Sequence, residues 1–169
     1  MKNINIKFFL GHIVIITLIF SLDRATKIYL LNLHESGVNV DFYVFSFLNI
    51  YLAWNTGIGF GLLSTDPNIF YHLLTVIIVM INLVLIFLLI NLRDIRRYFI
   101  SVILGGSLGN CFDRIYYFAV PDFIDLHIGD FHWFIFNIAD IFITIGIICL
   151  IFVEIFVKNN NEKRNEKNI

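Results

Sequence analysis

The stretch GGSLGNCFDRIYYFAVPDFIDLHIGDFHWFIFNIAD, residues Gly105–Asp140, decides how this chain is organised. It begins inside one apolar run, passes through a polar segment and enters a second apolar run. Ionisable groups inside a membrane are energetically costly, and their usual role is functional. The polar residues that this stretch places in or beside the apolar runs are Asn110, Asp113, Arg114, Asp122, Asn137 and Asp140. We take Asp122 and Asp140 as the candidate catalytic pair.

The composition is that of a polytopic membrane protein. Of the 169 residues, 59% are hydrophobic and 15% are charged, whereas soluble domains average roughly 45–50% and 25%. A helix needs ~20 apolar residues to cross the hydrocarbon, and the backbone in lipid must satisfy its own hydrogen bonds. Four runs of about this length predict four transmembrane helices: residues 8–33, 69–92, 98–118 and 134–157. We expect a single membrane domain over residues 1–157 and a charged, disordered tail over residues 158–169.

The positions of Lys and Arg predict the orientation of these helices. Such residues precede the first run, lie between the second and third, and follow the fourth. The segments 32–68 and 119–133 contain none. The positive-inside rule therefore places both termini in the cytoplasm and both long loops outside. The formal net charge of -1 gives no indication of nucleic acid binding.

The two outer segments have different patterns. Residues 38–54, VNVDFYVFSFLNIYLAW, are rich in aromatic and β-branched residues and predict short strands. The glycine-rich NTGIGFG at 55–61 predicts a tight turn or a close backbone approach. Residues 122–134, DFIDLHIGDFHWF, predict an amphipathic segment lying at the membrane interface. Because Pro121 disfavours helix at the residue before it, we expect Asp122 on a loop at the outer rim.

Helix geometry places the acids of three helices at one depth. With a rise of 1.5 Å per residue, Asp23 and Asp113 each lie roughly 22 Å above the inner edge. Asp140 lies about 9 Å below the outer edge, so all three fall near the outer interface of a core ~30 Å thick. The GxxxG spacing of Gly105 and Gly109 predicts a close approach to a neighbouring helix.

Two carboxylates held close together cannot both ionise cheaply, so one keeps its proton. The ionised group can then take a proton from water while the neutral group polarises the bond under attack. This aspartic-protease arrangement needs neither a metal nor a cofactor, and we predict none. Asp23, Lys27, Asp113 and Arg114 are expected to be supporting charges, although ion pairs that only fix helix register remain an alternative for them.

A second group of polar residues offers an alternative site. His127 and His132, with Asp125 and Asp130, contain the residue types that bind metals. Their spacing matches no standard zinc pattern, so a solvated loop at the interface is the favoured interpretation.

Taken in order, the motifs resemble the bacterial lipoprotein signal peptidases, the signal peptidase II family, over nearly the whole chain. The matching segments are SLDRATK with Asp23 and Lys27, WNTGIGFG with Asn55 and Gly57, GNCFDR with Asn110, Asp113 and Arg114, VPDFID with Asp122, and FNIAD with Asn137, Ala139 and Asp140. The resemblance implies that Asp122 and Asp140 are the catalytic aspartates and that the other residues support them or bind substrate.

The resemblance also implies a fold and an activity. The expected fold is an all-α polytopic membrane protein, with four transmembrane helices, a small outer β-sheet and an interfacial helix. The expected activity is that of an aspartic endopeptidase, a hydrolase that cuts diacylglyceryl-modified prolipoproteins just before the lipidated cysteine. Such a protein would act as a monomer in the bacterial cytoplasmic (inner) membrane, among membrane lipids and without nucleic acid, with its site near the outer face.

Two other classes of protein were weighed. A small transporter or proton-conducting protein would use intramembrane acids as relay sites, and would spread them across the full depth of the membrane. A non-enzymatic assembly or chaperone subunit would use the Gly105–Gly109 face. Asp122 would have no role in such a protein. Under either alternative, Asp140→Asn would leave the processing of a lipidated precursor unchanged.

Overall fold

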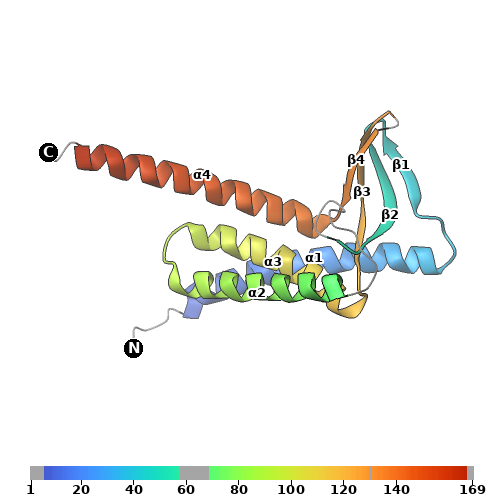
Figure 1. The fold of residues 1–169 in the computed structure, drawn as a ribbon, viewed down its shortest axis with the longest axis horizontal. Helices are drawn as coiled ribbons and strands as arrows, with labels where there is room; N and C mark the ends of the chain where they lie inside the picture. The colour runs from blue at the N-terminus through green and yellow to red at the C-terminus, as the bar shows by residue number, and fades with distance from the viewer. Residues whose placement is uncertain (1–5, 58–68, 130, 167–169) are drawn as a thin grey trace.

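The computed structural model describes residues 6–57, 69–129 and 131–166 of the chain. Four helices and four strands form in this part of the chain, and Figure 1 shows the sheet standing at one end of the helices. The helices are α1 (Ile6–Glu35), α2 (Ile69–Asn91), α3 (Arg96–Tyr116) and α4 (Ile138–Glu166). The strands are β1 (Asp41–Phe45), β2 (Leu48–Asn55), β3 (Val120–Ile128) and β4 (Phe131–Phe136).

The first three helices match the predicted apolar runs to within a few residues at each end. The fourth begins at Ile138, later than the run that starts at residue 134. Phe134–Phe136 belong to β4 instead, because aromatic and β-branched residues suit a half-buried strand. The helix α4 also continues through Glu166, into the tail for which disorder was predicted.

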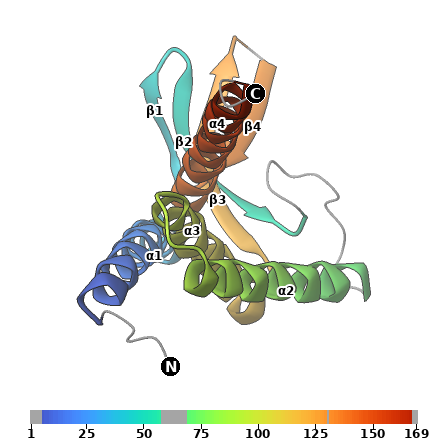
Figure 2. The ribbon, with the colours of Figure 1, turned by 90° about the vertical axis from the view of Figure 1, so that its left-hand side faces the viewer.

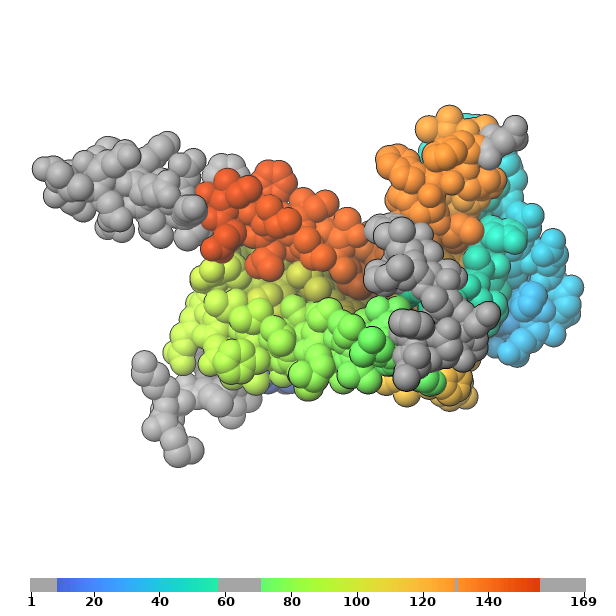
Figure 3. All heavy atoms as spheres, viewed as in Figure 1, coloured from blue at the N-terminus to red at the C-terminus, as the bar shows by residue number. Residues whose placement is uncertain are grey.

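The sheet is antiparallel, with the strands in the order β1-β2-β3-β4. Two of its strands, β1 and β2, confirm the short strands predicted for residues 38–54. Figure 3 shows the sheet as a lobe that rises from the helices, with β3 and β4 in orange. Residues 58–61 of the glycine-rich segment lie outside the described residues.

The second outer segment forms strands. The described residues of 122–134 belong to the hairpin of β3 and β4, which corrects the expected interfacial helix for this segment, whereas its place at the membrane interface stays a prediction. Gly129 lies in the turn at φ +59°, a conformation that glycine adopts without steric cost. The alternation of polar and apolar residues in this segment has the period of a strand.

Asp122 consequently lies in a strand and not on a loop. The helix α3 does end at Tyr116, ahead of Pro121, and Phe118 turns the chain with a φ of 59°. Pro121 pairs with Trp54 of β2, whereas the pairing of β3 with β4 begins only at Ile124. Proline fits here because one edge of β3 is still unpaired at this point and needs no N–H donor.

The helix α3 packs against the three other helices, as Figure 2 shows from the end of the molecule. Its glycines allow this close approach: a Cβ on Gly105 would lie 2.9 Å from Ile19 Cβ of α1, and one on Gly109 would lie 2.6 Å from Asp23 Oδ2. On the other side, a Cβ on Gly106 would lie 2.6 Å from the Ala139 carbonyl oxygen of α4. The close packing predicted from the GxxxG spacing is confirmed.

Among the described residues, two helical segments are long and apolar enough to cross a membrane by length and composition: Tyr71–Asn91 and Ile138–Ile155. Only 11% of the residues in each are buried, so neither is the core helix of a soluble domain. The prediction of four spans is therefore supported for α2 and α4. Buried charged residues lie in the other two helices, in α1 at Asp23, Arg24 and Lys27 and in α3 at Asp113 and Arg114.

Candidate active site

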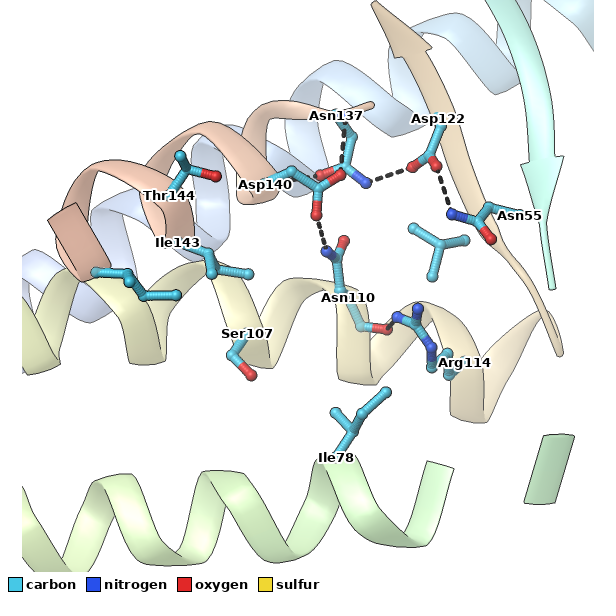
Figure 4. Close-up of a pocket in the computed structure, with 12 residues that line it drawn as sticks. Asn55, Ile78, Ser107, Asn110, Arg114, Asp122, Asn137, Asp140, Ile143 and Thr144 are labelled. Atoms are coloured by element: carbon cyan, nitrogen blue, oxygen red, sulfur yellow. Dashed lines mark hydrogen bonds between the residues drawn. The ribbon is translucent and has the colours of Figure 1, made fainter. Parts of the chain in front are cut away.

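A cavity of about 290 Å³ opens where α3, α4 and the sheet meet. Figure 4 shows the carboxyl groups of Asp122 and Asp140 on the same side of this cavity, with the amides of Asn55, Asn110 and Asn137 turned toward them. Its apolar wall comes from α2, α4 and β3, through Ile78, Val120, Ile143 and Ile147. The lining of the cavity therefore combines two carboxyl groups with apolar side chains.

Asp122 reaches the cavity from β3, and its side chain is held between two amides. Asn55 Nδ2 donates to Asp122 Oδ2 at 2.8 Å, and Asn137 Nδ2 donates to Asp122 Oδ1 at 2.6 Å. Burial, followed by the nearby charge of Asp140, raises the pKa of Asp122 to about 7, although the two amide donors act in the opposite direction. Asp122 therefore keeps its proton below about pH 7 and is only partly protonated at neutral pH.

Asp140 is positioned by the first turn of α4. Asn137 is the N-cap: its Oδ1 accepts from the Asp140 N–H at 3.1 Å, and Asp140 Oδ2 accepts from the Asn137 N–H at 3.1 Å. This reciprocal pair is a capping box, which satisfies two N–H groups that a helix start leaves free. Asn110 Nδ2 of α3 donates to the other oxygen of Asp140 at 2.8 Å. Asn137 therefore contacts both carboxyl groups.

A fully buried ammonium group joins α1 to α3 below the cavity. Lys27 Nζ donates to Asp23 Oδ2 at 2.7 Å, to Asp113 Oδ2 at 2.7 Å and to Asn110 Oδ1 at 2.8 Å. The other oxygen of Asp23 accepts from the backbone N–H of Ala139 at 3.0 Å. The three acids predicted to share one depth are thus brought together. Asp23 and Asp113 both accept hydrogen bonds from Lys27, and Asn110 connects Lys27 to Asp140.

The remaining predicted residues hold Asn55 and Gly57, in the described part of the glycine-rich segment, against α3. The Gly57 N–H donates to Asn55 Oδ1 at 2.8 Å, and Arg114 Nη2 donates to the Gly57 carbonyl at 2.9 Å. Arg114 also donates to the Asn110 carbonyl at 3.2 Å. These bonds fix Asn55, which in turn holds Asp122.

Sequence reasoning missed two residues of this network. Arg24 is buried and pairs with Asp113. Two cations, Lys27 and Arg24, therefore lie between α1 and α3. The position of Arg24 inside an apolar run, beside Asp23, was the signal that could have identified it. Tyr71 is 1% exposed and donates its hydroxyl to the Arg114 carbonyl at 2.9 Å. A single tyrosine at the start of an apolar run gave no such signal.

The residues considered as an alternative metal site lie outside this cavity. Asp125, His127 and His132 come together on the β3–β4 hairpin, where His132 Nδ1 lies 2.8 Å from Asp125 Oδ2. Asp130 falls outside the described residues.

The hydrogen bonds of Lys27 lead to a prediction about stability. Lys27→Met leaves Asp23 without a cationic partner among the described residues and Asp113 with Arg24 alone. Because an uncompensated buried charge is costly, the free energy of unfolding should fall by about 3–5 kcal/mol. Thermal unfolding of the purified chain in detergent measures this loss.

Arg96→Met is the matched control, because Arg96 also pairs with two acids, Asp94 and Glu154, but at an exposed position. Its effect should stay within about 1 kcal/mol. Equal effects of the two substitutions would contradict a structural role for the buried ammonium group.

Comparison with known proteins identifies the family. A family model described as "Signal peptidase (SPase) II" matches residues 15–156. The chain is 52% identical over 168 residues to a lipoprotein signal peptidase of Pelagibacter ubique (99% of this chain, 100% of that one) and 43% identical over 142 residues to one of Aquifex aeolicus (83% of each). A solved bacterial membrane enzyme is 30% identical, with a TM-score of 0.74 over 91% of this chain and 92% of the other. The chain belongs to the signal peptidase II family.

Proposed function

We propose that this chain is an aspartic endopeptidase embedded in the membrane. It removes the signal peptide from diacylglyceryl-modified prolipoproteins by cutting before the lipidated cysteine. The observation that carries this proposal is the pair formed by Asp122 and Asp140, which line one cavity and take their hydrogen bonds from amides. Membership of the signal peptidase II family supports the substrate class.

The two carboxyl groups have different roles in the proposed reaction. Asp140 is the base: it sits in the first turn of α4, where the helix dipole stabilises an anion, and it takes a proton from the attacking water. Asp122 is the acid: burial and the nearby charge of Asp140 raise its pKa to about 7, so it can carry a proton before the reaction, and it gives this proton to the scissile carbonyl oxygen. The tetrahedral diol then collapses: the C–N bond breaks, the leaving nitrogen takes the proton from Asp140, and one hydroxyl of the diol returns its proton to Asp122. The products are a new carboxyl end and a new amino end, and both aspartates regain their starting protonation.

The remaining residues position this pair. Asn55, Asn110 and Asn137 orient the carboxyl oxygens, and the Ala139 N–H ties the start of α4 to Asp23. Lys27 and Arg114 act through these groups, together with Asp113 and Gly57. No metal ion or cofactor is needed for this chemistry.

The proposed setting is the bacterial inner membrane, crossed by all four helices of one domain over residues 1–157. The wide exposure of apolar side chains on α2 supports lipid contact, for example Val84 at 55% and Phe87 at 64%. The start of α1 and the end of α4 lie at the end of the molecule away from the sheet (Figure 1), which fits termini in the cytoplasm and a site at the outer face. There a diacylglyceryl chain can stay in lipid while the peptide bond beside it reaches the cavity. The chain is proposed to act as a monomer.

Two observations favour this proposal over the alternatives. A transporter needs acids along a path, whereas the acids of three helices meet in one network beside the sheet, linked by Lys27 and Asn110. An assembly subunit would need the Gly105–Gly109 face for a partner, and that face is already packed against Ile19 and Asp23 of the same chain.

The first test is cleavage of a diacylglyceryl-modified prolipoprotein by the purified chain in detergent, followed by gel shift. Asp122→Asn and Asp140→Asn should each lower the rate by at least ~10²–10⁴-fold, the usual contribution of a general acid or base. Asp94→Asn, in the short link between α2 and α3, is the control and should cleave like the parent. A rate that survives either site substitution would remove that residue from the pair.

The pH dependence tests the role of Asp122. As the pH rises through about 7, Asp122 loses its proton, both acids are ionised and the cleavage rate should fall. Asn55→Ala removes a donor that stabilises the Asp122 carboxylate, so the pKa rises and the fall should move to higher pH. Asn82 lies on α2 and outside the cavity, so Asn82→Ala should not shift the pH dependence of the cleavage rate. A fall that moves to lower pH in Asn55→Ala would argue against Asp122 as the acid.

The orientation can be tested with single added cysteines in bacterial spheroplasts. Ile128→Cys, at a position 76% exposed on the hairpin, should react with a thiol reagent that cannot cross the membrane. Arg93→Cys, between α2 and α3, should react only after lysis. The parent chain reports the background from Cys111 and Cys149. The reverse pattern would invert the proposed topology.

A further inference from the structure

A second polar cluster lies on the β3–β4 hairpin, apart from the catalytic cavity. Asp125 and His127 are two residues apart on β3, and the strand register pairs His127 with His132 of β4. The ligand atoms of these three side chains all lie within 4.8 Å of one another. The two imidazole rings have centroids 5.3 Å apart. A carboxylate and two imidazoles therefore converge on one small volume.

The charge of Asp125 has no ordinary counter-ion. Its side chain is 2% exposed, and a buried carboxylate is costly unless a cation or several donors compensate it. The sequence contains no Lys or Arg between Lys27 and Arg93, or between Arg114 and Lys158, so the sheet carries none. Either the two imidazoles or a bound ion can supply a positive charge beside Asp125.

Several acceptor atoms around Asp125 also lack a donor. Among the described residues, Asp125 Oδ1 and His127 Nδ1 are buried without a hydrogen-bond partner, and His127 Nδ1 is 3.7 Å from Asp125 Oδ2. Asn49 Oδ1 is also buried without a hydrogen-bond partner among the described residues. Asn49 pairs directly with Asp125 in the register of β2 and β3. Buried polar atoms are normally satisfied by protein, water or an ion, and a single ion at this point would satisfy all three atoms.

We propose that Asp125, His127 and His132 bind a divalent transition-metal ion of the zinc type. Two imidazole nitrogens and a carboxylate oxygen are common ligands of such ions, and the Asn49 carbonyl or a water completes a fourth position. Tetrahedral ligands lie roughly 3.3–3.5 Å from one another, so the most widely separated ligand atoms would approach by up to about 1.5 Å. His132 Nδ1 and Asp125 Oδ2, now 2.8 Å apart, would separate slightly. His132 is 56% exposed, which gives the ion a path from the solvent.

The ion would join the two strands that lead to the catalytic pair. The strand β3 carries Asp122 three residues before Asp125, and β4 ends at Phe136, next to Asn137. None of the three ligands lines the cavity, so the ion stabilises the hairpin and takes no part in peptide cleavage. This inference stands independently of the proposed peptidase activity.

Zinc binding by the full chain is the direct test. The chain is purified in detergent without a polyhistidine tag, stripped with chelator and titrated with Zn²⁺ by calorimetry, with Co²⁺ absorption as a second readout. We expect one ion per chain, a tetrahedral Co²⁺ spectrum and a rise in Tm on adding Zn²⁺. His132→Ala and Asp125→Asn should each weaken binding at least ~10-fold and remove the rise in Tm.

The exposed His132 makes the first variant safe for folding, and His34→Ala at the exposed end of α1 is the matched control. His34→Ala should bind Zn²⁺ like the parent. The proposal is overturned if a well-folded parent binds no Zn²⁺, since Asp125 would then be compensated by protonated histidine. It is equally overturned if His132→Ala and Asp125→Asn bind like the parent, or if His34→Ala weakens binding as much as they do.

Discussion

The ammonium group of Lys27 is the contact on which the rest of the structure depends. It is fully buried between α1 and α3 and donates to Asp23, Asp113 and Asn110. A buried ion is tolerated only when its partners satisfy it completely, and here three acceptors do so. Gly109 allows this arrangement, because a side chain there would collide with Asp23 Oδ2. From Asp23 the connection continues to the Ala139 N–H, and so to the first turn of α4. The helices are therefore fixed relative to one another by the same polar atoms that lie beneath the cavity.

Much of this could be predicted from the sequence, because the deciding signals are local. The apolar runs predicted the helices, and the rise of 1.5 Å per residue predicted a common depth for Asp23, Asp113 and Asp140. The start of α4 could not be found this way: the run from residue 134 is continuously apolar, and only the capping box of Asn137 and Asp140 marks where helix begins. The β3–β4 hairpin was missed because aromatic residues next to acids also suit a segment lying in the interface. The clustering of Asp125, His127 and His132 depends on strand register, which spacing along the chain does not reveal.

The polar residues of the site fall into two groups with different partners. Asp23 and Asp113 contact cations, through Lys27 and Arg24. In contrast, Asp122 and Asp140 receive their hydrogen bonds from the side-chain amides of Asn55, Asn110 and Asn137 and from the Asn137 N–H. A cation in direct contact strongly favours the ionised form of a carboxylate. An amide donor orients the carboxylate but favours its ionised form less. The first group suits a permanent structural role, and the second suits the proton transfers proposed for Asp122 and Asp140.

This separation also accounts for the position of Lys27 one step away from the proposed catalytic pair. If Lys27 contacted Asp140 directly, the charge would be neutralised there and would no longer disfavour a second anion at Asp122. Asn110 prevents this, because its Oδ1 accepts from Lys27 while its Nδ2 donates to Asp140. The amide keeps Asp140 out of direct contact with the ammonium group, although the charge of Lys27 still lowers the pKa of Asp122. Two neighbouring carboxyl groups can then share one proton, which is the condition that an aspartic peptidase needs before it binds its substrate.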